Sequence, residues 1–86
     1  MTHLILLYPG DKKATYNDLH WRIDNFQPAV RVEKYCWAVS TTKSTNALTA
    51  DLSDYIDKEN DKLLVCEVKS CNLLNFPESI TESFID

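Results

Sequence analysis

Glycine is almost absent from this chain of 86 residues, which contains only Gly10. A loop that wraps the phosphates of a nucleotide needs several glycines in a short stretch, because its backbone must approach the ligand closely. The sequence therefore excludes the common glycine-rich nucleotide-binding loops.

Cysteine is also scarce, and the three residues present are Cys36, Cys66 and Cys71. An odd and sparse set predicts free thiols in a reducing compartment and not a disulfide framework. Four residues separate Cys66 from Cys71, and no histidine lies near them in the sequence. We therefore expect no metal site at these cysteines.

Long hydrophobic runs are missing as well. No stretch approaches the roughly 20 apolar residues that a membrane-spanning helix needs. The segment that begins with Met1 carries no basic region of the kind that opens a signal peptide. We therefore expect a cytoplasmic protein without a membrane partner.

Positively charged residues are fewer than negatively charged ones. The chain has nine Lys and Arg residues and thirteen Asp and Glu residues, which give a formal net charge of −4. Bulk electrostatics then weakly oppose binding to nucleic acid, which favours positively charged proteins. A protein partner is favoured for this reason, and a local patch would still allow nucleic acid to bind. With 44% hydrophobic and 26% charged residues, the composition predicts one folded domain over residues 1–86.

Apolar and turn-forming segments alternate along the chain in an order that predicts four strands. Short runs rich in β-branched, aromatic and leucine residues are bounded by turn residues such as Pro9 and Gly10. The expected strands are Leu4–Tyr8, Ala29–Glu33, Tyr35–Thr41 and Leu63–Val68.

Two stretches between these strands carry apolar residues at helical spacing. Thr15 and Asp18 form a pattern typical of a capping box before the first helix, and the segment Lys43–Asn46 supplies capping residues for the second. The expected inner faces consist of Tyr16, Leu19, Ile23 and Phe26 in the first helix, and Leu48, Leu52, Tyr55 and Ile56 in the second.

The resulting order predicts an α+β protein with a ferredoxin-like βαββαβ fold. We expect an antiparallel four-stranded sheet with the first strand in its centre and both helices on one face. Residues 2–68 form the core of this fold, and residues 69–86 add a C-terminal strand or tail.

The second face of the predicted sheet is also apolar, although helices cover only one face. A domain of this size has a thin stability margin, so a second subunit related by a two-fold axis is the expected cover. The C-terminal segment is a second candidate. Trp21 lies nearly opposite the apolar face of its helix. It either takes part in an interface, since tryptophan is enriched at binding hot spots, or is partly buried under its neighbours. The predicted interface residues are Trp21, Tyr35, Trp37, Leu73, Leu74 and Phe76.

One acidic residue is a candidate for catalysis. Asp11 follows the first strand, and Lys12 and Lys13 come directly after it. A carboxylate in this loop could hold Mg²⁺ while the two lysines lie near phosphate. The alternative is a solvated turn, since Gly-Asp is common turn chemistry.

Three segments resemble a known family of small proteins. They are Leu4–Tyr8, Tyr35–Val39 and the sequence Asp-Lys-Leu-Leu-Val-Cys-Glu-Val at Asp61–Val68. Over about residues 2–68 the chain resembles SinR-like proteins, which are similar to the ferredoxin-like CRISPR adaptation nuclease subunit and to virulence-associated protein D. The resemblance implies a homodimer with a C-terminal strand that swaps onto the partner subunit. Members of the family include metal-dependent nucleases and non-catalytic nucleic-acid scaffolds.

The resemblance also implies a Tyr-Asp pair at the end of the first strand, where the aspartate holds metal. Tyr8 matches this pair, but Pro9 stands in place of the aspartate, and Asp11 comes two residues later. We therefore expect a non-catalytic or degenerate member without a cofactor, which binds a protein or nucleic acid in phage–host defence or a toxin–antitoxin pair. The alternative is a Mg²⁺-dependent endoribonuclease that uses Asp11.

Overall fold

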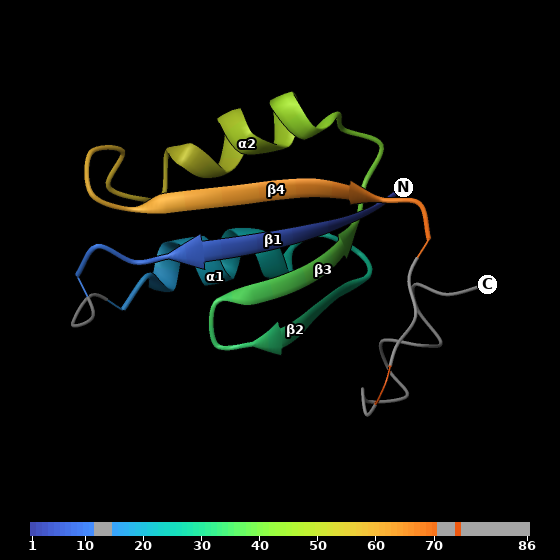
Figure 1. Ribbon diagram of the computed structural model, residues 1–86, viewed down its shortest axis with the longest axis horizontal. Coiled ribbons are helices and arrows are strands. Elements are labelled where there is room, and N and C mark those ends of the chain that lie inside the picture. Colours follow the sequence, from blue (N-terminus) through green and yellow to red (C-terminus); the bar gives the residue numbers. More distant parts are fainter. Residues whose placement is uncertain (12–14, 71–73, 75–86) are drawn as a thin grey trace.

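The computed structural model describes residues 1–11, 15–70 and 74, and shows an α+β chain (Figure 1). Four strands and two helices follow one another in the expected βαββαβ order. Their bounds are β1 (Thr2–Tyr8), α1 (Asn17–Asp24), β2 (Ala29–Glu33), β3 (Cys36–Ser40), α2 (Thr45–Ser53) and β4 (Lys62–Val68).

All strand pairs in the sheet are antiparallel, and the strand order is β2-β3-β1-β4. The predicted position of β1 in the interior is confirmed, since β1 pairs with β3 on one side and with β4 on the other. Ile5, for example, lies opposite both Trp37 and Val65. This arrangement is compatible with a ferredoxin-like fold.

The core lies on one face of the sheet, and both helices contribute to it. Alternate residues of a strand point to the same face, and here the odd-numbered residues of β1 and β3 are the ones that face the helices. Figure 1 shows α1 behind β1 and β3. The buried cluster consists of Ile5, Leu7, Leu19, Ile23, Trp37, Val39, Leu48 and Leu52.

The start of α1 differs from the predicted capping box. Tyr16 is the N-cap residue, has φ 54° and ψ 33° in the left-handed region, and makes no hydrogen bond from its side chain to the helix backbone. Thr15 therefore lies one residue before the cap. The cap of α2 falls within the predicted segment Lys43–Asn46, since Oγ of Ser44 accepts a hydrogen bond of 3.1 Å from the backbone N–H of Ala47.

The hairpin between β2 and β3 contains a further difference. Tyr35 belongs to the turn and not to the third strand, which begins at Cys36. The pairing also shifts register between Arg31 and Glu33. Such a bulge compensates for a turn that lacks the glycine pairs of tight hairpins.

Several predicted features lie outside the described residues. They include Lys12 and Lys13 after β1, and Leu73 and Phe76 in the C-terminal extension, with the strand expected there. Leu74 is described and is exposed. Neither helix in the described part of the chain is long and apolar enough to cross a membrane.

Candidate functional site

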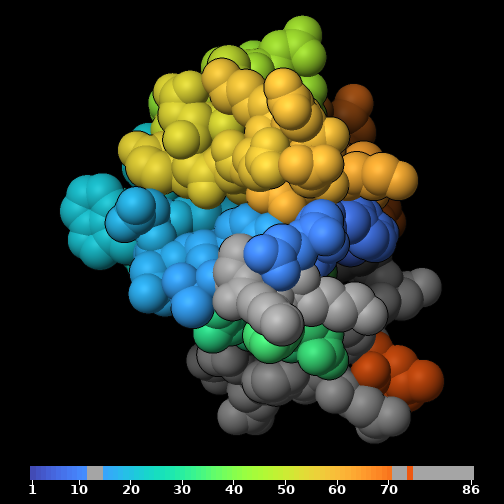
Figure 2. Space-filling model, turned by 90° about the vertical axis from the view of Figure 1, so that its left-hand side faces the viewer, coloured from blue at the N-terminus to red at the C-terminus, as the bar shows by residue number. Residues whose placement is uncertain are grey.

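A cavity of about 820 Å³ opens where three segments meet at one end of the sheet. They are the turn after β1, the start of α1 and the turn between α2 and β4, and Figure 2 shows the side of the molecule on which they lie. Its lining residues are Gly10, Asp11, Thr15, Tyr16, Asn17, Asp18, Tyr55, Asp57, Asn60 and Asp61.

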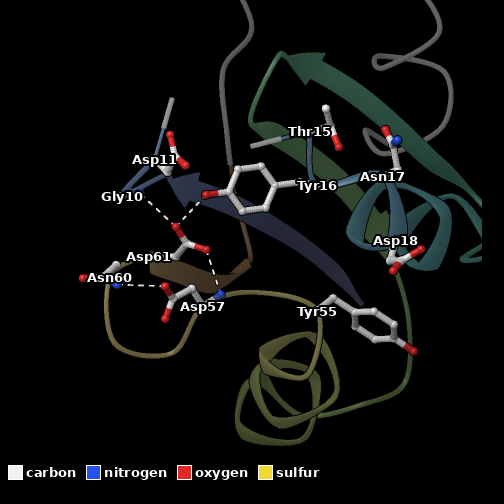
Figure 3. Close-up of a pocket in the computed structure, with 10 residues that line it drawn as sticks. All are labelled: Gly10, Asp11, Thr15, Tyr16, Asn17, Asp18, Tyr55, Asp57, Asn60 and Asp61. Atoms are coloured by element: carbon white, nitrogen blue, oxygen red, sulfur yellow. Dashed lines mark hydrogen bonds between the residues drawn. The ribbon is translucent and has the colours of Figure 1, made fainter. Parts of the chain in front are cut away.

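Asp61 connects all three segments through its carboxylate (Figure 3). Its Oδ1 accepts hydrogen bonds from the Tyr16 hydroxyl at 2.6 Å and from the Gly10 backbone N–H at 2.8 Å. Its Oδ2 accepts one from the Asp57 backbone N–H at 2.8 Å. Burial acts to raise the pKa of Asp61, but these hydrogen bonds to the charged form outweigh burial and hold the pKa below its ordinary value.

Tyr16 occupies a strained backbone conformation at this point. A left-handed φ is uncommon for a residue other than glycine, and the hydrogen bond to Asp61 helps to hold Tyr16 there. Its ring also meets that of Tyr35 edge to face, with centroids 6.1 Å apart. Burial, and then the hydrogen bond and charge of Asp61, raise the pKa of Tyr16 to about 12. The phenol therefore stays protonated at neutral pH and acts as a donor, not as a base or nucleophile.

Gly10 is required by the close approach of two turns. A Cβ atom at this position would lie only 2.4 Å from the backbone oxygen of Asn60. The absence of a side chain lets the turn after β1 come near enough to donate its N–H to Asp61.

Asp57 shapes the turn that leads into β4. Its carboxylate accepts hydrogen bonds from the backbone N–H of Glu59 at 3.0 Å and from the side-chain amide of Asn60 at 2.8 Å. Hydrogen bonds from these two residues lower the pKa of Asp57. The segment from Asp57 to Asp61 is thus an ordered hydrogen-bonded turn.

Asp11, the predicted catalytic residue, lies on the cavity wall and is exposed. Over residues 1–11, 15–70 and 74, no three His, Cys, Asp or Glu side chains come together as a possible metal site. Asp61, another carboxylate of this wall, is already engaged by three hydrogen bonds.

The charge of the cavity determines which ligands it favours. Four of its lining residues are aspartates, and no lysine, arginine or histidine is among the lining residues that the structure describes. Such a wall repels phosphate groups. It favours a neutral or positively charged partner.

The predicted interface residues fall in different environments. Trp21 is 65% exposed on α1, whereas Trp37 is buried in the core at 1% exposure. Tyr35 is half-buried beside Tyr16. The structure therefore does not bring these three aromatic residues together on one surface.

The face of the sheet opposite the helices is the second candidate site. Residues that lie opposite one another in the register share a face, and no helix of the described residues packs on this one. The charged residues among the paired positions on it are Lys62 and Glu33, which lies opposite Cys36 beside the register shift. This helix-free face consists of Thr2, Leu4, Leu6, Tyr8, Val30, Glu33, Cys36, Ala38, Ser40, Lys62, Leu64, Cys66 and Val68.

Exposed apolar groups lie on the helix-free face. Tyr8 is 53% exposed and Leu64 is 48% exposed. Leu4 and Leu6 of β1 are half-buried on the same face, with Leu6 directly opposite Leu64. Cys36 and Cys66 are free thiols on the same face, as the sequence predicts for these two residues.

Sequence reasoning missed the role of Tyr16 and Asp61. The sequence predicts Tyr16 on the inner face of a helix, and it assigns no functional role to Asp61. These residues are 45 positions apart in the sequence, so no local pattern connects them. In the sequence, Pro9 and Gly10 directly after the first strand indicate a tight turn, but they do not indicate which residue packs against that turn.

Comparison with known proteins identifies no relative of this chain. No known protein family, curated protein or solved structure matches it.

Proposed function

We propose that this protein is a non-catalytic, homodimeric interaction module with ferredoxin-like architecture, which pairs through the helix-free face and binds another protein. The observation that carries the proposal is the apolar character of the helix-free face, together with the exposure of Leu64 and Tyr8 on it. An apolar sheet face left to water is unfavourable, so it favours a partner surface.

A second copy of the chain is the occupant that fits this face best. A two-fold interface places the same surface on both subunits, so the surface must be complementary to itself. Apolar side chains meet this condition. The two charged residues of the helix-free face, Lys62 at the start of β4 and Glu33 at the end of β2, lie on the edge strands of the sheet and have opposite charges. The net charge of −4 is carried elsewhere and opposes pairing only at a distance.

The substitution Leu64→Lys tests the interface directly. Because Leu64 is half exposed in the single subunit, a lysine can extend into water there without disturbing the core. We expect the fold to persist, as judged by circular dichroism, and the dimer to dissociate, as judged by light scattering. Ala50→Lys is the matched control. Ala50 is exposed on α2, so this substitution adds the same charge away from the helix-free face.

Two results would contradict the proposed interface. One is an unchanged dimer in Leu64→Lys. The other is equal dissociation in Leu64→Lys and Ala50→Lys, since this would show that added charge, and not its place on the helix-free face, separates the subunits.

The alternative function is that of a Mg²⁺-dependent endoribonuclease that uses Asp11. Its support is the position of Asp11 in the cavity wall. Against it stand the acidic lining, which repels the RNA backbone, and the engagement of Asp61 in three hydrogen bonds. Purified protein incubated with RNA and Mg²⁺ separates the two functions. Cleavage that Asp11→Ala abolishes would overturn the non-catalytic proposal.

A further inference from the structure

Trp21 stands on the outer face of α1. Leu19 and Ile23 of the same helix are fully buried against the sheet, whereas Trp21 is 65% exposed. An exposed indole presents a large flat apolar surface to solvent, and nothing in the fold described here requires it at this position. The outer face of α1 is also distinct from the helix-free face, because the sheet lies between them.

The neighbours of Trp21 on the helix surface are polar or acidic. Residues three and four positions away lie beside it, and these are Asn17 and Asp18 on one side and Asp24 and Asn25 on the other, all of them exposed. The indole is thus flanked by a carboxylate at each end. We call the surface formed by Trp21, Asp18 and Asp24 the α1 outer face.

Neither Asp18 nor Asp24 forms an ion pair within the described residues. The ion pairs in this part of the chain involve other carboxylates: Asp51 pairs with Arg22 and Lys43, and Asp54 pairs with Lys58. Asp24 acts electrostatically on His20, but burial and the charge of Arg31 hold the pKa of His20 below its ordinary value. His20 is therefore neutral at pH 7 and does not offset the charge of Asp24.

Asp24 is also unfavourably placed for the stability of its own helix. It is the last residue of α1, where the partial negative charge of the helix dipole disfavours a carboxylate. Arg22, the basic residue of the last turn, points away toward Asp51. A residue that breaks a local rule of helix stability in an exposed position is the kind of feature expected at a binding site.

We propose that the α1 outer face docks an arginine-bearing segment of a protein partner. A guanidinium group stacks on an indole ring and donates hydrogen bonds in a plane, and here carboxylates lie at both ends of the ring. Asp18 belongs both to the α1 outer face and to the lining of the acidic cavity. The cavity and the α1 outer face therefore form one negatively charged surface, which complements a basic segment. The inference rests on the proposed role in protein binding, but does not depend on pairing of the subunits.

A labelled hexa-arginine peptide is a suitable probe, with hexa-lysine of the same length as comparison. Binding is followed by fluorescence anisotropy at low ionic strength, where exposed charges are least screened. We expect hexa-arginine to bind more tightly than hexa-lysine, since lysine lacks the planar group that stacks on Trp21. Addition of hexa-arginine also changes the emission of the wild-type protein but not that of Trp21→Phe, in which only the buried Trp37 emits.

Three substitutions locate the binding surface. Trp21→Ala is expected to weaken hexa-arginine binding about fivefold or more and to remove the preference over hexa-lysine. Asp24→Asn is expected to weaken binding by about two- to threefold. Glu59→Gln is the matched control, because it removes one exposed negative charge away from α1, and its effect should be smaller than that of Asp24→Asn.

The proposal is overturned if the two peptides bind equally well, if Trp21→Ala binds hexa-arginine as the wild type does, or if Asp24→Asn and Glu59→Gln weaken binding to the same extent. Each of these outcomes would show general attraction to an acidic protein. The mass in solution is measured on the same samples. A monomer that still binds hexa-arginine through Trp21 would contradict the dimer and leave the α1 outer face in place.

Discussion

The hydroxyl of Tyr16 lies 2.6 Å from Oδ1 of Asp61 and joins the start of α1 to the start of β4. The same oxygen accepts the N–H of Gly10, so one carboxylate connects two turns and the start of α1 at this end of the sheet. This network explains how a residue with left-handed backbone geometry can open a helix. It also accounts for much of the polar character of the cavity in structural terms.

Loss of the Tyr16 hydroxyl should destabilise the protein. Tyr16→Phe removes a hydrogen bond to a charged acceptor, which is expected to lower the free energy of unfolding by about 1–3 kcal/mol. Urea unfolding measures this change. When Asp61→Asn is already present, Tyr16→Phe should lower the free energy of unfolding by less, because the uncharged asparagine is a weaker acceptor for the Tyr16 hydroxyl. Equal costs in both backgrounds would contradict the network.

The substitution Gly10→Ala tests the close approach of two turns. At a permissive site, Gly→Ala stabilises a protein by roughly 0.4–1 kcal/mol, because it restricts the unfolded chain. Here the new Cβ would meet the backbone oxygen of Asn60 at 2.4 Å. We therefore expect a loss of stability of about 1–3 kcal/mol in urea unfolding. A gain in stability would show that the turns are farther apart in solution.

The acid stability of the protein should depend on Asp51. Its carboxylate accepts hydrogen bonds from Nε of Arg22 at 3.0 Å and from Nζ of Lys43 at 3.0 Å, and it is only 15% exposed. The hydrogen bonds from Arg22 lower the pKa of Asp51. Burial acts to raise this pKa, and the hydrogen bond from Lys43 lowers it further. Because the pKa is lower in the folded state, the stabilisation is present above the unfolded value of about 3.9 and is lost as pH falls through the folded value.

Asp51→Asn should therefore unfold more easily at pH 7, by about 1–3 kcal/mol, and lose less stability than the wild type between neutral and acidic pH. Thermal unfolding across this pH range makes the comparison. Asp54→Asn is the control, because its pair with Lys58 is long at 3.5 Å and strongly exposed. It should change stability by less than about 0.5 kcal/mol. A similar pH profile for Asp51→Asn and the wild type would contradict the role of Asp51.

His3 offers a substitution that should stabilise the protein. Its side chain is fully buried on the helix-covered side of β1, and neither ring nitrogen has a hydrogen-bond partner among the described residues. Buried polar atoms without partners cost about 1–3 kcal/mol each. His3→Leu removes them, and we expect urea unfolding at pH 7.5 to show a gain of about 1–2 kcal/mol. A loss of stability would show that His3 is hydrogen-bonded in solution.

The architecture could be predicted from the sequence because it depends on local patterns. Runs such as Leu4–Tyr8 and Leu63–Val68 carry apolar residues in numbers typical of strands, and the four-residue spacing of Leu19 and Ile23 is typical of a helix. The same spacing places Trp21 nearly opposite the apolar face of its helix, but it does not decide between exposure and partial burial, and the structure shows the residue 65% exposed.

The cavity could not be predicted in this way, because it depends on contacts between distant turns. Gly10 and Asp61 are 51 positions apart, and a hydrogen bond between them leaves no periodic trace in the sequence. The start of α1 was misassigned for a related reason. Thr15 and Asp18 have the spacing of a capping box, but the bond from Tyr16 to Asp61 sets the backbone at this point.

The mass of the protein in solution tests the central claim most directly. Sedimentation equilibrium at micromolar concentration should give twice the chain mass of 9.9 kDa, because the proposed dimer covers the helix-free face with a second copy. The substitution Leu64→Lys should return the mass to that of one chain. A wild-type protein that sediments at 9.9 kDa over the whole concentration range would contradict the account.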